Sequence, residues 1–257
     1  MKKGIIDTHA HVACSELLDK IDEIIQHAQD NNIIKILIIC TTLTEAKIAI
    51  TLSEKNPLFD CAVGFHPEDA NTITDNDLIK LKEVLAHPRM IALGEIGLDY
   101  YWVQDNKEKQ QELFIKQIEI ARSLALPILV HMRDASADTV KILSEHKIPG
   151  VLHCYSGSLE TSKLLLKQGY YLSFAGPITY KNAKEAPITC LEAPLDRIFV
   201  ETDSPYLTPH PFRGKQNEPA YVRYTFDKVC EIKGIEPEVA MTAMMDNYRR
   251  LFTKTTL

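Results

Sequence analysis

The chain has 257 residues, of which 45% are hydrophobic and 25% charged, and its formal net charge is −6. This composition is typical of a globular protein, and it excludes a disordered or a fibrous class. The negative net charge argues against a protein that coats nucleic acid or anionic membrane over its whole surface. It leaves room for a small basic patch inside a cleft.

The six cysteines are scattered along the chain without a C-x-x-C pair, which favours neither a zinc ribbon nor a dense disulfide framework. Reduced thiols in a cytoplasmic protein are the simpler interpretation. The apolar run near the N-terminus is broken at once by Asp7, His9 and His11, so it lacks the apolar region of a signal peptide. No run approaches the roughly 18 apolar residues of a membrane span, and no membrane contact is expected.

Short apolar runs rich in β-branched residues alternate with segments of helical hydrophobic spacing along most of the chain. The predicted strands are 4–11, 33–40, 59–64, 90–94, 128–131, 151–154, 170–174 and 198–201. The predicted helices are 17–28, 44–54, 76–85, 107–124, 136–146, 158–168, a weaker one at 182–192, 221–233 and 237–252. A Pro-rich loop at 204–219 follows the last strand.

This alternation predicts the fold class. Strands interleaved with amphipathic helices imply a parallel α/β sheet, and eight such units close into a TIM (β/α)₈ barrel. An open doubly wound sheet is the alternative, but it would need a Gly-rich phosphate-binding turn after the first strand, where this chain has His-Ala-His. Residues 1–257 are therefore predicted to form a single domain.

Two histidines stand two residues apart at the end of the first predicted strand. Side chains at i and i+2 of a strand point the same way, so His9 and His11 are expected to face one spot. Neutral imidazole is a common metal ligand, and functional side chains of such barrels stand at the C-terminal ends of the strands. Four other predicted strand ends carry a metal-capable residue, namely Glu95, His131, His153 and Asp203.

Any one of these residues alone would be more simply interpreted as a hydrogen-bonded structural residue. Their occurrence together at successive strand ends predicts a metal site at the C-terminal rim. The histidines at 27, 87 and 146 fall on predicted helices or beside a proline, and we expect them at the surface.

Four imidazoles and two carboxylates are enough for two divalent ions that share a carboxylate. Such a pair lowers the pKa of a water molecule and stabilises the attacking and leaving oxygens of a displacement, so the site predicts a hydrolase. Glu95, on a central strand, is the expected bridging ligand. Asp203 is the candidate for metal ligand and general base together, because its carboxylate can accept the proton of the attacking water.

The ligand-bearing motifs closely resemble those of the TatD family of metal-dependent deoxyribonucleases. The matching segments are DTHAH at 7–11, GEIGLDYY at 94–101, PILVHMR at 127–133, HCYSG at 153–157, ETDSPYL at 201–207, RGKQNEP at 213–219 and NYRRLF at 247–252. The resemblance implies a TIM barrel of the amidohydrolase superfamily and 3′-to-5′ exonuclease activity on DNA with a divalent metal. It also implies a ligand role for His9, His11, Glu95, His131, His153 and Asp203.

Positive charge near the ligands bears on the substrate. Arg133 lies two positions after a predicted ligand, and Arg213 lies in the loop after the last strand. Arginine offers bidentate hydrogen bonds to a phosphate, which favours a phosphodiester substrate. The alternative for Arg133 is a salt bridge with Asp134 or Glu95 at the barrel rim.

Other residues give weaker indications. Lys181 and Lys215 could extend the basic patch or be plain solvated charges. His66 could donate to a phosphate oxygen, or it could be a loop residue fixed ahead of Pro67.

Three aromatic residues follow Glu95 in the chain. Stacked bases of single strands favour such aromatic platforms. We expect Tyr100 and Tyr101 to cover the barrel mouth and Trp102, the single tryptophan, to contact substrate.

The sequence thus predicts a divalent-metal-dependent phosphodiesterase with Mg²⁺, Mn²⁺ or Zn²⁺, acting on single-stranded or frayed DNA ends without an obligate protein partner. A rival hypothesis is hydrolysis of an amide or ester, as by a deacylase, because metal-activated water can also attack a carbonyl carbon. A non-enzymatic metal-binding or nucleic-acid-binding protein is a third.

Overall fold

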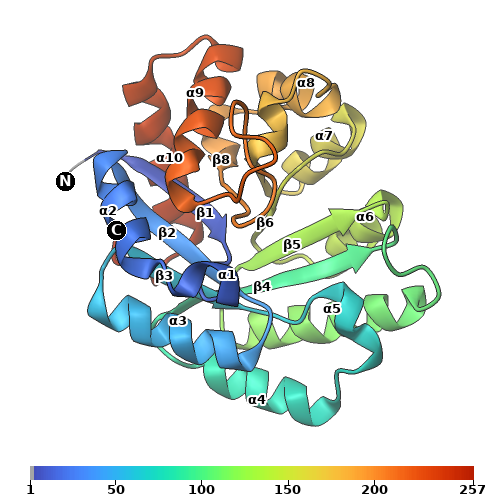
Figure 1. Ribbon diagram of the computed structural model, residues 1–257. Coiled ribbons are helices and arrows are strands. Elements are labelled where there is room, and N and C mark those ends of the chain that lie inside the picture. The colour runs from blue at the N-terminus through green and yellow to red at the C-terminus, as the bar shows by residue number, and fades with distance from the viewer. Residues whose placement is uncertain (1–2) are drawn as a thin grey trace.

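The computed structural model describes residues 3–257 and has eight parallel strands surrounded by helices (Figure 1). Hydrogen-bonded neighbours follow chain order from the first strand to the eighth. The strands are β1 (Ile5–Ala10), β2 (Ile33–Cys40), β3 (Phe59–Val63), β4 (Met90–Asp99), β5 (Ile128–Arg133), β6 (Gly150–Leu152), β7 (Tyr171–Phe174) and β8 (Ile198–Val200).

The first and last strands come together just beyond their C-terminal ends. Ala10 and Ser204 form a parallel bridge, the Asp203 N–H donates to the His9 carbonyl at 2.9 Å, and the His11 N–H donates to the Ser204 carbonyl at 2.8 Å. These contacts nearly close the sheet, so the predicted TIM barrel is confirmed.

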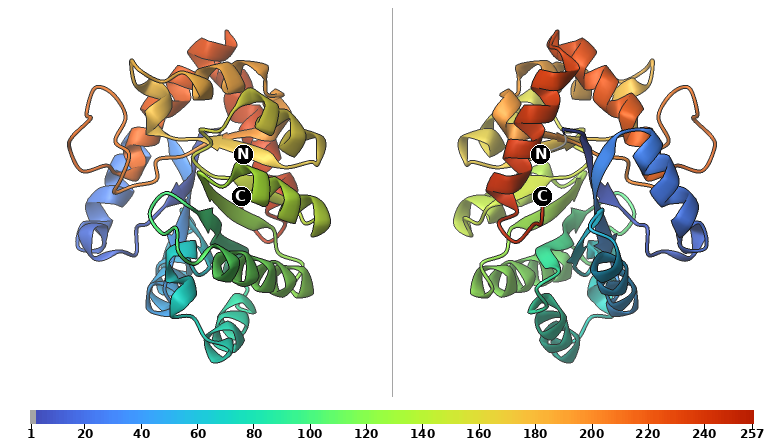
Figure 2. Two further views of the ribbon diagram at one scale, coloured as in Figure 1. Left: turned by 90° about the vertical axis from the view of Figure 1, so that its right-hand side faces the viewer. Right: turned by 90° about the vertical axis from the view of Figure 1, so that its left-hand side faces the viewer.

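The helices lie outside the strands and ring the barrel in the side views of Figure 2. They are α1 (Ser15–Leu18), α2 (Ile21–Asp30), α3 (Leu43–Lys55), α4 (Asp75–Leu85), α5 (Lys107–Ser123), α6 (Ser136–Glu145), α7 (Leu159–Lys167), α8 (Glu185–Glu192), α9 (Val222–Lys233) and α10 (Pro237–Leu251). Four 3₁₀ helices connect elements: η1 (Pro67–Asn71), η2 (Gly176–Thr179), η3 (Leu195–Arg197) and η4 (Pro219–Tyr221). Among residues 3–257, no helix combines the length and apolar character needed to cross a membrane.

Local sequence explains several helix ends. At α3 the Glu45 N–H donates to Thr42 Oγ1, and the Thr42 N–H donates to the Glu45 carboxylate, each at 3.2 Å. This capping box satisfies two backbone donors that the first helical turn leaves free. At the other end of the chain, Pro237 occupies the first turn of α10, as the sequence predicts.

Three of the differences from the sequence prediction bear on the fold and the site. The predicted helix 17–28 is two helices, α1 and α2, because the apolar period continues across the break and hides it. The weak helix predicted at 182–192 begins only at Glu185. Strand β4 continues past the predicted end at residue 94 to Asp99, paired with β5, so its polar residues lie within the sheet.

The barrel interior is filled by alternate strand residues. A separate apolar cluster inside the strands includes Leu37, Leu129 and Phe199, and it continues into Tyr248 and Phe252 at the end of α10. These residues close the N-terminal end of the barrel. The opposite, C-terminal end is therefore where a cavity can open.

Candidate metal centre

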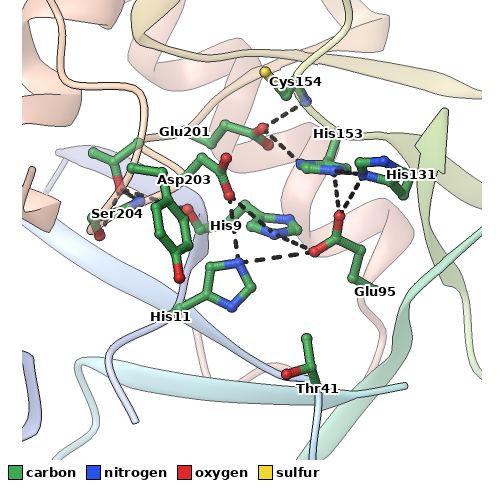
Figure 3. Close-up of polar contacts among 12 residues, drawn as sticks. His9, His11, Thr41, Glu95, His131, His153, Cys154, Glu201, Asp203 and Ser204 are labelled. Carbon is green, nitrogen blue, oxygen red and sulfur yellow. Dashed lines mark hydrogen bonds and ion pairs between the residues drawn. The ribbon is translucent and has the colours of Figure 1, made fainter. Parts of the chain in front are cut away.

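The Glu95 carboxylate stands at the centre of the C-terminal rim, with imidazoles on both of its oxygens (Figure 3). Glu95 Oε2 lies 3.3 Å from His9 Nε2 and 3.8 Å from His11 Nε2. Its Oε1 lies 2.6 Å from His153 Nε2 and 2.8 Å from His131 Nδ1. The two oxygens of one carboxylate thus face two separate pairs of histidines.

Asp203 completes one of these groups. Its Oδ1 lies 3.6 Å from His9 Nε2 and 3.4 Å from His11 Nε2 (Figure 3). Strands β1 and β8 bring the three residues together, since the Asp203 N–H is bonded to the carbonyl of His9. The structure therefore places all six predicted ligands in one cluster.

Asp7 supports the junction of these two strands from below. Its Oδ1 accepts hydrogen bonds from the Thr202 N–H at 2.9 Å and the His9 N–H at 3.3 Å, and its Oδ2 lies 2.6 Å from Thr202 Oγ1. Asp7 is fully buried, and this burial raises its pKa to about 8. It contacts the backbone of His9 and of Thr202 rather than the imidazoles, so its role is structural.

His131 and His153 each have a second carboxylate on the far side of the ring. His131 Nε2 lies 2.9 Å from Asp99 Oδ2, and His153 Nδ1 lies 3.4 Å from Glu201 Oε1. The Glu201 carboxylate also accepts the Cys154 N–H at 2.6 Å. Carboxylates behind metal-binding histidines fix the orientation of the rings, and both of these are buried.

The pKa directions follow from these contacts. Burial raises the pKa of Glu95, but His153, His131 and His9 outweigh it and hold that pKa well below its usual range. Burial lowers the pKa of His153, but Glu95 and Glu201 raise it well above normal. The carboxylates are therefore ionised while imidazoles hold protons, and a cation could replace these protons.

Burial likewise raises the pKa of Asp203, while the hydrogen bond with His11 and the nearby imidazoles lower it more, so that it ends below its usual range. His9 is completely buried, and burial lowers its pKa. Within residues 3–257, neither ring nitrogen of His9 has a hydrogen-bond partner. A buried imidazole that faces two carboxylates without a well-formed hydrogen bond fits a divalent cation, and so does the mixed nitrogen and oxygen donor set.

A cavity of about 820 Å³ opens over this cluster. The cluster forms its floor, and one wall is apolar, with Phe174, Pro177 and Ile178 from β7 and η2. Arg133 and Trp102 line the mouth. The space is large enough for a small-molecule ligand or the end of a polymer.

Arg133 does not form the salt bridge with Asp134 or Glu95 that was the alternative to phosphate binding. Its guanidinium carbon lies 4.1 Å from the ring centroid of Tyr101 and 5.3 Å from that of Trp102. Tyr101 and Trp102 are 48% and 62% exposed. Tyr100 is buried, with its hydroxyl donating to Asp138, and the expectation that Tyr100 and Tyr101 cover the mouth stays a prediction.

His66 lies closer to the ligands than the sequence suggests. Its Nε2 is 3.7 Å from Glu95 Oε1, and its ring packs edge-on against His131 with 4.6 Å between centroids. Burial lowers the pKa of His66 to about 4, so the ring is neutral at pH 7. A ring nitrogen of His66, a carboxylate oxygen of Glu95 and a ring nitrogen of His131 form a further group of possible ligand atoms.

Arg213 is not brought into the cavity. Arg213 lies in the loop after β8, and its guanidinium carbon is 4.4 Å from the ring centroid of Tyr180. It does not line the cavity wall. Figure 2 shows this orange loop projecting beside the first helices. His27, on α2, is exposed, while His87 and His146 are partly exposed on the outside of the barrel.

The sequence interpretation missed the residues that support the ligands. Asp99 and Glu201 stand within matching motifs, but no role was assigned to them. Asp99 follows Glu95 by four positions on one strand, and this even spacing was a usable signal. It was hidden because β4 was predicted to end at residue 94.

A parallel eight-stranded barrel with histidines and carboxylates gathered at its C-terminal rim defines a class of protein, the metal-dependent hydrolases with an amidohydrolase-like fold. Residues 6–253 match the family described as TatD related DNase, and the chain belongs to this family.

Relatives and solved structures agree with this assignment. The uncharacterized metal-dependent hydrolase YabD of Bacillus subtilis is 39% identical over 251 residues, which cover 96% of this chain and 98% of the relative. The crystal structure of YjjV, a TatD homologue from Escherichia coli, matches with a TM-score of 0.92 and 27% identity over 98% of this chain and 99% of its own. An uncharacterized amidohydrolase from Saccharomyces cerevisiae shares the fold, with a TM-score of 0.83 and 18% identity over 97% of this chain and 100% of its own.

Proposed function

We propose that this chain hydrolyses phosphodiester bonds of DNA and removes nucleotides from the 3′ ends of single-stranded or frayed strands. One observation carries the proposal most directly. Arg133 lines the cavity beside the cluster and has no carboxylate partner among residues 3–257, so its guanidinium donors are free for a phosphate. The family description as a DNase supports the same substrate class.

Two divalent ions would be held on the two sides of Glu95. His9, His11 and Asp203 form one ligand group, and His131 and His153 form the other, with Glu95 shared. Bound Mg²⁺, Mn²⁺ or Zn²⁺ would supply Lewis-acid catalysis, which lowers the pKa of a water molecule and neutralises charge on a phosphate.

Asp203 is the proposed general base. Its side chain is 13% exposed and lines the cavity, and its lowered pKa keeps the carboxylate ionised at neutral pH. An ionised carboxylate that faces the substrate space can accept the proton of an attacking water. The His11 contact holds this carboxylate in place.

Arg133 and His66 are the proposed phosphate contacts inside the cavity, since both line it. Trp102, exposed at the mouth, is proposed to stack on a base of the strand. Arg213, outside the cavity, would contact only the more distant part of a longer strand.

The test is degradation of short single-stranded DNA by the purified protein with Mg²⁺ or Mn²⁺. Phosphorothioate linkages at the 3′ end should block degradation, and the same linkages at the 5′ end should not. Activity should disappear on chelation and in Asp203→Asn. Degradation that survives both treatments would refute the mechanism.

A second assay addresses the substrate class. A panel of amides, lactones and carboxylic esters is run with the same protein and metal. Turnover of these substrates without turnover of DNA would favour the deacylase-like alternative. Binding of Trp102 to DNA can be followed separately, because quenching of its emission reports on the single tryptophan.

A further inference from the structure

His131 lies between two carboxylates that belong to the same strand. Its Nδ1 faces Glu95 Oε1 at 2.8 Å and His153 Nε2 at 3.1 Å, while its Nε2 faces Asp99 Oδ2 at 2.9 Å. Only one nitrogen of a neutral imidazole carries a proton, and the bond made by one nitrogen decides what the other can do. The identity of the protonated nitrogen therefore controls whether His131 can act as a ligand.

Both oxygens of the Asp99 carboxylate are in use. Oδ2 faces His131, and Oδ1 accepts the backbone N–H groups of Tyr101 and Trp102, each at 2.9 Å. The backbone of Asp99 is held by Gln110, which accepts its N–H and donates to its carbonyl, both at 2.9 Å. Asp99 itself has no exposed surface, so it has little freedom to adopt another arrangement.

We infer that Asp99 is a positioning residue that selects which nitrogen His131 presents to the metal centre and, with its other oxygen, fixes the segment that carries Trp102. An ionised carboxylate only accepts, so His131 donates its Nε2–H to Asp99. Nδ1 faces Glu95 and His153, so it is the nitrogen whose proton a cation would replace, while the proton on Nε2 stays with Asp99. This inference depends on the metal centre alone and holds whatever substrate the enzyme hydrolyses.

Replacement by asparagine separates the two tasks, because the amide has a single acceptor oxygen. That oxygen can satisfy the two backbone N–H groups of Tyr101 and Trp102, and the amide nitrogen then faces His131. Two donors cannot face each other, so His131 has to move its proton to Nδ1 and accept from the amide through Nε2. A protonated Nδ1 is not available to a metal ion.

The experiment compares Asp99→Asn, Asp99→Ala and the control Asp105→Asn, which removes an exposed carboxylate of the same loop. Long-range ¹H–¹⁵N spectra of the metal-free protein show which ring nitrogens of His131 carry protons, with Nε2 among them in the wild type, and calorimetric titration with Mn²⁺ gives metal affinity. Anisotropy of the emission of Trp102 reports the mobility of its segment. Thermal unfolding of the metal-free variants shows that each one folds.

Asp99→Asn is expected to carry the His131 proton on Nδ1, to bind Mn²⁺ about 10- to 100-fold more weakly, and to keep the anisotropy of Trp102. Asp99→Ala is expected to bind Mn²⁺ more weakly and to lower the emission anisotropy of Trp102. Asp105→Asn is expected to change neither quantity. Wild-type Mn²⁺ affinity with His131 protonated on Nε2 in Asp99→Asn would overturn the inference. An equal loss of affinity in Asp105→Asn would overturn it as well. A failure of the DNA assay would leave these binding results unaffected.

Discussion

Gly97 of β4 lies directly opposite His131 of β5, and the two backbones are in close contact. A Cβ placed on Gly97 would lie 2.0 Å from the His131 carbonyl oxygen, and the φ angle of Gly97 is 144°. Glu95 and Asp99 flank Gly97 by two residues on either side, so their side chains share its face of the strand. The absence of a side chain at Gly97 lets His131 reach both carboxylates.

Gly97→Ala is expected to destabilise the protein and to displace His131. Backbone strain alone costs about 1–3 kcal/mol, and the clash with the carbonyl adds to it. Gly169→Ala is the matched control, because Gly169 also has a positive φ of 92° but nothing lies within 4 Å of a Cβ there. Urea unfolding should show the larger loss for Gly97→Ala, and only this variant should bind Mn²⁺ more weakly. Equal losses for the two variants would contradict the role given to the close contact.

His11→Ala is expected to lose metal and hydrolytic activity while keeping the fold. The His11 side chain is 14% exposed at the rim and contacts Glu95 and Asp203 rather than the apolar core. Metal analysis, activity and thermal unfolding of the metal-free protein measure the three effects. His87→Ala, on the outside of the barrel, serves as the control. Full activity and metal content in His11→Ala would show that His11 is not a ligand.

Arg133→Ala should separate phosphodiester from carboxylic ester substrates. A hydrogen bond to a charged group contributes about 1.5–3 kcal/mol, so kcat/KM for a phosphodiester should fall about 10- to 100-fold. Esters without a phosphate should lose much less, and Arg133→Lys should be intermediate because it keeps the charge but loses the bidentate geometry. The same loss for both substrate classes would mean that Arg133 holds the cavity together instead of binding phosphate.

His27 gives a pH-dependent prediction away from the metal centre. Its Nδ1 lies 2.9 Å from Glu218 Oε2, and this hydrogen bond raises its pKa above the ordinary value of 6.5. A raised pKa in the folded state means that the pair stabilises the fold below pH 6.5 and that this contribution is lost as the pH rises through the folded pKa.

The stabilisation from the pair is small because His27 is largely exposed, so an NMR titration is the better measurement. Glu218→Gln should bring the pKa of His27 down toward its ordinary value. A pKa of His27 that does not respond to this substitution would show that the pair does not form in solution.

The fold and the clustering of the candidate ligands could be predicted because each depends on local pattern. Period-two and period-3.6 hydrophobicity marks the strands and helices, and a (β/α)₈ barrel brings every C-terminal strand end to one rim. His9, His11 and Asp203 could therefore be grouped although they are distant in sequence.

What the sequence could not reveal are contacts that depend on side-chain directions and on exact strand ends. The contact of Asp99 with His131 needs β4 to continue five residues beyond its apolar part, from residue 94 to residue 99, which hydrophobicity does not indicate. The position of His66 above Glu95, and that of Arg213 on Tyr180, depend on loop paths. Loop paths are set by tertiary packing, and no periodic pattern records them.

The most direct measurement of the central claim is a calorimetric Mn²⁺ titration of the metal-free protein, with hydrolysis of single-stranded DNA recorded at each step. The account predicts two ions per wild-type chain, hydrolysis that follows their binding, and loss of both metal and turnover in Glu95→Gln, because Glu95 lies between the two ligand groups. A wild-type protein that binds no divalent ion, or a Glu95→Gln variant with full metal content and turnover, would contradict it.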